Sequence, residues 1–112
     1  MINLRIYVAG PISKGDREAN LAAAIDAADR LLAAGWYPYV PHLGQLWDER
    51  HAHSYREWMA LDQGWLAACS ALLRLPGESP GADEEVAFAE VHGIRVYWSL
   101  EDAERDGWAE LA

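Results

Sequence analysis

Asp62 is an acidic residue in the apolar stripe of a predicted helix. The apolar residues three or four positions from it are Trp58, Met59, Trp65 and Leu66. Burying an ionised carboxylate without partners costs several kcal/mol, so Asp62 must be paired, hydrogen-bonded or exposed to a cleft. The alternative to a cleft residue is a structural brace that is bonded to loop backbone amides, and the spacing alone favours the brace.

Glu85 lies near the start of another predicted helix, just after the Ser-Pro-Gly segment at 79–81. Free backbone amides and the helix dipole favour negative charge there, so we expect Glu85 to stay ionised, as a nucleophile requires. An ordinary acidic first turn would look the same. The helical period distinguishes Glu85 from the two acidic residues before it, because Glu85 shares a side with Ala82 and Ala89 and they do not.

The loop at 10–16 follows the first apolar run and suits a small anion or a sugar. Its flexible or polar members are Gly10, Ser13, Lys14 and Gly15, and Lys14 is the only lysine of the chain. The loop matches neither a P-loop nor a dinucleotide fingerprint. His42 follows the second predicted strand, where it could contact a substrate or close a turn.

The remaining histidines and the cysteine do not indicate a metal site. His51 and His53 are separated by one residue and would point apart on a helix, so we expect surface histidines and no metal. The lone Cys69 cannot form an internal disulfide and is expected to be a small buried apolar residue.

Apolar runs and helical stripes alternate along the chain. Strands are predicted at 4–9, 36–40, 71–75 and 94–98, and helices at 17–34, 55–69, 81–92 and 100–111. Residues 44–54 lack a clean period, which predicts a long loop or a broken helix. The first helix is expected to bury the stripe Leu21, Ile25, Ala28 and Leu32.

This alternation predicts right-handed crossovers and a parallel sheet covered on both faces. We therefore expect one domain over residues 1–112, a three-layer α/β/α sandwich of the Rossmann-like or flavodoxin-like type, with strand order 2-1-3-4. Ligands of such sheets bind beyond the carboxyl ends of the strands, which brings loops 10–16, 41–46 and 76–85 to one edge.

Size and charge limit the partners. The chain has 112 residues, a mass of 12.5 kDa and a net charge of −9, which repels nucleic-acid polymers and anionic membranes. No apolar run approaches membrane-spanning length, and a cytoplasmic setting is expected. Six tryptophans in so small a chain predict a homodimer or a higher homo-oligomer.

Three segments together resemble the nucleoside 2-deoxyribosyltransferase superfamily, in order and spacing across most of the chain. They are Ile6-Tyr7-Val8-Ala9-Gly10-Pro11, then Trp58-Met59 with Asp62 and Trp65-Leu66, then Ser79-Pro80-Gly81-Ala82-Asp83-Glu84-Glu85 with Ala89. The chain looks closest to the short bacterial and phage members of unassigned substrate. It is also similar to the 2'-deoxynucleoside 5'-phosphate N-hydrolases.

The resemblance implies a role for each group. Glu85 would attack the anomeric carbon, Asp62 would handle the proton of the leaving base, and Tyr7 would orient the nucleophile. The residues implied to bind the sugar or its 5'-phosphate are Gly10, Ser13, Gly15, Ser79 and Gly81. Two positions depart from the relatives: Pro11 stands where phosphate-binding relatives carry Ser, and Ser70 where many carry Asp.

We therefore expect an enzyme that hydrolyses or transfers the glycosyl group of a small nucleoside or nucleotide, with net retention and without a cofactor. Glu85 would be the ionised group, and Asp62 would hold its proton longer in a more apolar niche. A catalytically silent nucleotide-binding module is the alternative, and an oligomerising structural protein would need neither carboxylate. Release of free base distinguishes an enzyme from a module.

Overall fold

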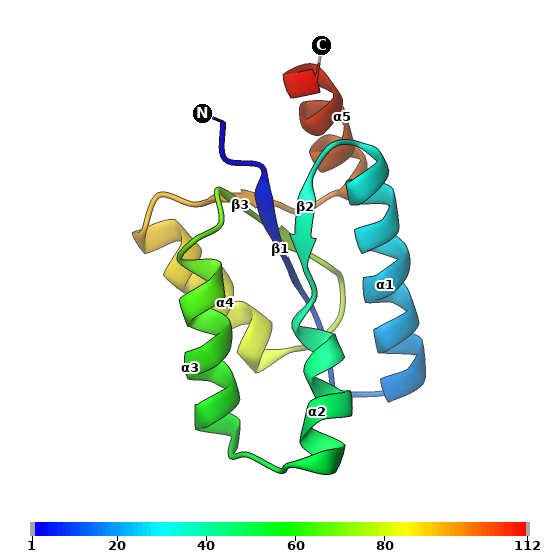
Figure 1. Cartoon of the computed structure of the whole chain (residues 1–112), viewed down its shortest axis with the longest axis vertical. Coiled ribbons are helices and arrows are strands. Elements are labelled where there is room, and N and C mark those ends of the chain that lie inside the picture. Colours follow the sequence, from blue (N-terminus) through cyan, green and yellow to red (C-terminus); the bar gives the residue numbers. More distant parts are fainter. Residues whose placement is uncertain (1, 112) are drawn as a thin grey trace.

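A computed structural model of the chain describes residues 2–111 and contains a four-stranded parallel sheet between two helical layers (Figure 1). The strands are β1 (Arg5–Ala9), β2 (Tyr37–Tyr39), β3 (Ala71–Arg74) and β4 (Arg95–Tyr97). The helices are α1 (Arg17–Ala33), α2 (Gly44–Arg50), α3 (Tyr55–Leu66), α4 (Pro80–Val91) and α5 (Leu100–Leu111), with a 3₁₀ turn, η1 (Pro41–Leu43). The strand order is β2-β1-β3-β4, which confirms the predicted α/β fold and order.

The two faces of the sheet carry separate cores. One face packs against α1 and α5, and its buried residues include Ile6, Val8, Ala24, Leu31, Leu73 and Ala103. The other face packs against α3 and α4, and its buried residues include Tyr7, Leu66, Leu72, Ala82 and Ala89. Residues alternate between the faces along β1 and β3, as side chains of a strand do. Within 2–111, no helix is long and apolar enough to cross a membrane.

Helix α1 presents a different stripe to the sheet from the predicted one. The residues it buries are Ala24, Ala27 and Leu31, one position before members of the expected set. Ile25 and Leu32 are instead exposed, at 43% and 57%. Small side chains let a helix lie close to a sheet, so the alanine face of α1 takes the inner position.

Residues 44–54, for which a long loop or a broken helix was predicted, form the short helix α2 and a loop that leads into α3. The turn η1 runs directly into the short α2, which ends before His51. The Asp48 carboxylate then accepts hydrogen bonds from the His53 amide (2.9 Å) and from the Trp58 indole (2.7 Å), which ties α2 to α3. A capping box of Ser54 and Glu57 begins α3.

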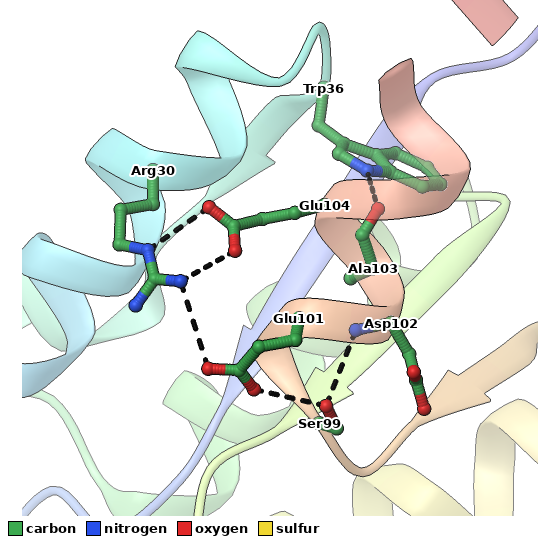
Figure 2. Close-up of polar contacts among 7 residues, drawn as sticks. All are labelled: Arg30, Trp36, Ser99, Glu101, Asp102, Ala103 and Glu104. Carbon is green, nitrogen blue, oxygen red and sulfur yellow. Dashed lines mark hydrogen bonds and ion pairs between the residues drawn. The ribbon is translucent and has the colours of Figure 1, made fainter. Parts of the chain in front are cut away.

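Helix α5 is held against α1 and the start of β2 by polar contacts (Figure 2). The Glu104 carboxylate accepts from Nε (3.0 Å) and Nη2 (2.5 Å) of Arg30, and the Trp36 indole donates to the Ala103 carbonyl (2.7 Å). Gly107 lies so close to this junction that a Cβ there would stand 2.6 Å from the carbonyl oxygen of Ala34. Figure 1 shows that the far end of α5 extends away from the carboxyl edge of the sheet.

Strand β2 is an edge strand and carries Pro38 at its centre. Pro38 lies opposite Ile6 of β1, and the Tyr37 amide donates to the Leu4 carbonyl (2.8 Å). Proline is tolerated in sheets at such edges because it has no backbone N–H to contribute to a ladder. The position is thus consistent with the strand order.

Candidate active site

A cavity of about 300 Å³ lies at the carboxyl edge of the sheet, between the first loop, α3 and the start of α4. Its lining includes six of the predicted site residues: Gly10, Ser13, Asp62, Ser79, Gly81 and Glu85. Lys14, Tyr55 and Met59 complete much of the wall. Segments distant in the sequence thus meet at the edge where the sheet topology places ligands.

Glu85 is buried on the sheet-facing side of α4, whereas Asp83 and Glu84 are exposed. The predicted facing of Glu85 is therefore confirmed. The hydroxyl of Tyr7, a fully buried residue of β1, donates a hydrogen bond to Oε2 of Glu85. Burial, together with the negative charges of Glu85 and Asp62, raises the pKa of Tyr7, so its hydroxyl remains protonated as a donor.

The protonation of Glu85 differs from the expectation. Burial raises its pKa to about 7, while the hydrogen bond from Tyr7 acts in the opposite direction. Glu85 lies in the second turn of α4, beyond the free backbone amides of the helix start. At the helix start itself, the Ser79 hydroxyl accepts a hydrogen bond from the Ala82 amide (3.1 Å). Desolvation therefore outweighs the helix terminus, and Glu85 exchanges its proton near neutral pH.

Asp62 is buried on α3 and lines the same cavity. Its Oδ1 accepts a hydrogen bond from the hydroxyl of Tyr39 in β2 (3.1 Å), and no backbone amide among residues 2–111 donates to it. The backbone-bonded brace is therefore not what the structure contains. Burial raises the pKa of Asp62 to about 6, opposed by the Tyr39 hydrogen bond. The order of the two pKa values is thus the reverse of the one expected.

Two predicted binding residues lie away from this cavity. Gly15 belongs to the first loop but is not in the cavity lining, and its φ of +77° makes it a turn residue. His42 is fully buried, with Nε2 3.0 Å from the Pro11 carbonyl oxygen. Burial lowers the pKa of His42, which favours the neutral ring. His42 therefore contacts the backbone of the first loop at Pro11 and does not line the cavity.

Arg74 fixes the loop before α4 and was not singled out from the sequence. It ends β3 with its side chain buried, and it donates to the carbonyl of Leu75, the carbonyl of Gly77 (3.0 Å) and the Asp83 carboxylate (3.0 Å). Arg74 is the one charged residue in the otherwise apolar strand β3, and this feature of the sequence could have identified it. Arg74 thus positions the turn that carries Ser79.

A second cavity of about 280 Å³ adjoins the first. The two share Ile12, Ser13, Tyr55, Met59 and Asp62 in their linings. The second cavity adds Arg17, Gln45, Asp48 and Trp58, a mixture of one aromatic ring and polar groups. A ligand with two chemically different parts could therefore span both cavities, with Asp62 at their boundary.

The histidine just before α3 contacts the first turn of that helix. His53 Nδ1 lies 2.9 Å from Oε2 of Glu57, one turn along the chain. Over the described part of the chain, no three His, Cys, Asp or Glu side chains gather closely enough to hold a metal ion. Cys69 is buried, as predicted, and burial raises its pKa to about 11.

Comparison with known proteins places the chain in a family defined by sequence. No curated protein shows significant similarity to it. A family model does match, and it covers residues 4–98, from β1 through β4, including the cavity and both carboxylates but not α5. The chain therefore belongs to the family described as Domain of unknown function (DUF4406).

Proposed function

We propose that the protein cleaves the N-glycosidic bond of a small nucleoside or nucleotide, with Glu85 as nucleophile and Asp62 as acid. One observation carries this proposal: two buried carboxylates line a single cavity, and each accepts a hydrogen bond from a tyrosine. Retaining cleavage of a glycosidic bond uses two carboxyl groups of this kind, one as the nucleophile and one as the acid and base. The resemblance to the deoxyribosyltransferase superfamily supports the same reaction.

In the first step, ionised Glu85 attacks the anomeric carbon. A bond forms between a Glu85 oxygen and that carbon while the bond from carbon to the base nitrogen breaks, and its electron pair stays with the base. Asp62 gives its proton to the departing base and becomes a carboxylate. The hydrogen bond from Tyr7 favours the ionised form of Glu85 that this step consumes.

In the second step, the Asp62 carboxylate takes a proton from water, and the water oxygen displaces Glu85 from the anomeric carbon. A second base in place of water would give transfer instead of hydrolysis. Two displacements at one carbon retain the configuration of the sugar. Both carboxyl groups return to their starting protonation states.

The cavity linings support a ligand with a polar sugar end and a flat ring. Ser13, Lys14 and Ser79 supply hydroxyl groups and one positive charge beside Glu85. The adjoining cavity, with Trp58 and Gln45, offers an aromatic surface and an amide for a base. Asp62 lies between these parts, where the glycosidic nitrogen of a bound nucleoside would stand.

We also propose that the protein works as a homo-oligomer, at least a dimer, in the cytoplasm. Large apolar side chains are exposed along one side of the molecule, around a groove of about 410 Å³ between β2, α2 and α3. They include Leu43, Trp47 and Trp65, which are 49%, 52% and 54% exposed. Exposed apolar patches of this kind favour association. The lone Cys69, unable to form an internal disulfide, suits a reducing compartment.

A turnover assay tests the reaction. The protein is incubated with a panel of ribo- and deoxyribonucleosides and their 5'-monophosphates, and free base is followed by chromatography. Glu85→Gln should lower the rate on the order of a hundredfold or more, because the amide cannot act as a nucleophile. Glu84→Gln, which removes an equal charge from an exposed neighbour, should retain activity.

Two results would contradict the proposal. Equal losses in Glu85→Gln and Glu84→Gln would mean that Glu85 is not the nucleophile. Ligand binding without any release of base would mean that the protein is a silent binding module.

A further inference from the structure

Tyr39 stands beside Tyr7 as its partner in the sheet. The two residues are paired in the parallel register of β1 and β2, and their ring centroids lie 5.5 Å apart at 43°. Each hydroxyl donates to one carboxylate, Tyr7 to Glu85 on α4 and Tyr39 to Asp62 on α3. The two neighbouring strands thus present a matched pair of donors to the two acidic groups of the cavity.

We propose that Tyr39 is a positioning residue that holds Asp62 by Oδ1 and stabilises its ionised form after the proton has gone to the leaving base. This inference rests on the proposed function for the reaction, whereas the hydrogen bond between Tyr39 and Asp62 is present without a substrate. It assigns a role to a residue outside the three segments that carry the family resemblance.

Two aromatic rings restrain the Tyr39 ring. Trp65 stacks on it with centroids 5.8 Å apart at 27°, and the Tyr7 ring contacts it with centroids 5.5 Å apart at 43°. Trp65 is on the same helix as Asp62, one turn further on. The restraint therefore fixes the hydroxyl relative to the carboxylate and leaves Oδ2 of Asp62 as the oxygen free to carry a proton.

The hydroxyl of Tyr39 is suited to remain a donor. Burial and the adjacent Asp62 raise its pKa, so it stays protonated while Asp62 changes charge. A hydrogen bond to a carboxylate is stronger than one to the neutral acid, so it stabilises Asp62 most after proton transfer. Tyr39 thereby limits how far burial raises the pKa of Asp62.

Other ionisable groups surround Asp62 and would influence its titration. They are Tyr7 on β1, Glu85 on α4, Tyr55 on α3, Lys14 in the first loop, Arg17 on α1 and Asp48 on α2. Tyr39 is the group hydrogen-bonded to Asp62 among the described residues. A test must therefore change Tyr39 and leave these groups in place.

Tyr39→Phe removes the hydroxyl and keeps the ring. Tyr37→Phe is the matched control, because Tyr37 is on the same strand and 66% exposed. The pKa of Asp62 is measured by carbon-13 NMR titration of its carboxyl group, assigned by the loss of its signal in Asp62→Asn. We expect Tyr39→Phe to raise this pKa by about one pH unit, since a hydrogen bond to a charged group is typically worth at least that much. Tyr37→Phe should leave it unchanged.

An unchanged Asp62 pKa in a folded Tyr39→Phe protein would overturn the inference. Because the titration needs no substrate, it decides the role of Tyr39 even if the wild-type protein releases no base, a result that would instead contradict the proposed function. With an active substrate, the acidic limb of the kcat/KM profile, which follows the lower of the two carboxyl pKa values, should also move to higher pH in Tyr39→Phe. A lower rate with an unmoved profile would indicate a merely structural tyrosine.

Discussion

Gly77 approaches Pro11 so closely that the Cβ of an alanine at position 77 would lie 2.7 Å from Pro11 Cγ. Gly77 also has a φ of +114°, in the region that favours glycine. The loop before α4 and the first loop therefore fit together through a glycine and a proline. Pro11 therefore has a packing role in the structure.

Gly77→Ala should destabilise the protein by about 2 kcal/mol, because it adds both backbone strain and a steric conflict. Urea denaturation measures the change. Gly15→Ala is the control, since Gly15 has a φ of +77° but nothing within 4 Å of an added Cβ. A loss in Gly77→Ala no larger than in Gly15→Ala would mean that the contact with Pro11 contributes nothing.

Stability should fall as pH rises from about 4 to about 7. The folded-state pKa values of Glu85 and Asp62, about 7 and about 6, exceed their usual values of 4.5 and 3.8, so between these limits the folded protein binds more protons than the unfolded chain. Raising the pH then favours unfolding, by an amount on the order of 1–3 kcal/mol for Glu85. Thermal unfolding at several pH values should show the slope in wild type and a shallower one in Glu85→Gln. A slope equally reduced in Glu84→Gln would contradict this origin.

Activity should peak at about pH 6 to 7. The productive form has Glu85 ionised and Asp62 protonated, and their pKa values of about 7 and about 6 make this form a minority that is most populated between the two. A pH profile of kcat/KM checks the bell shape. Tyr7→Phe should move the alkaline limb, which follows the higher of the two pKa values, to higher pH, because Glu85 loses the hydrogen bond that lowers its pKa. A profile without an acidic limb would indicate that ionisation of Glu85 is not required.

Asp62→Asn should slow substrates with poor leaving bases more than substrates with good ones. A good leaving group depends less on protonation, whereas asparagine cannot supply a proton. Comparing kcat for bases of different acidity measures the effect. A loss independent of the leaving group, with a lower melting temperature, would point to a structural role for Asp62.

Light scattering at micromolar concentration should give the mass of a dimer or a larger oligomer. Leu43→Glu should reduce the mass by placing a charge in the apolar groove between β2 and α3. Leu32→Glu is the matched control, since Leu32 is similarly exposed but lies on α1, on the other layer of the molecule. A monomeric wild-type protein would rule out the oligomer.

The sheet could be predicted from the sequence because its signals are local. β-Branched and aromatic runs, with glycine at the ends of the first and third long helices, mark strands and helix ends without reference to the rest of the chain. The face of α1 could not be predicted in the same way. Ile25 and Leu32 are more hydrophobic than Ala24 and Ala27, but closeness to the sheet decided which side of the helix turned inward.

The residues that line the cavity could be predicted better than their protonation states. The resemblance selected Asp62 and Glu85, although spacing alone favoured a brace at Asp62, and both residues line the cavity. Their protonation depends on how completely water is removed from each, which follows from the packing of separate elements. Tyr39 was missed because its partner Asp62 is 23 positions away and no local pattern links them.

The proline in β2 also bears on how the protein behaves at high concentration. Backbone donors of a strand alternate in direction, and the Tyr37 amide points to β1, so the outward-pointing position between Tyr37 and Tyr39 is the one that Pro38 occupies. The open side of β2 therefore offers no N–H group to a strand from another molecule. An uncapped edge is the usual starting point for aggregation by sheet extension. Pro38 thus removes a donor that a strand added on this side would need, which opposes association by continuation of the sheet.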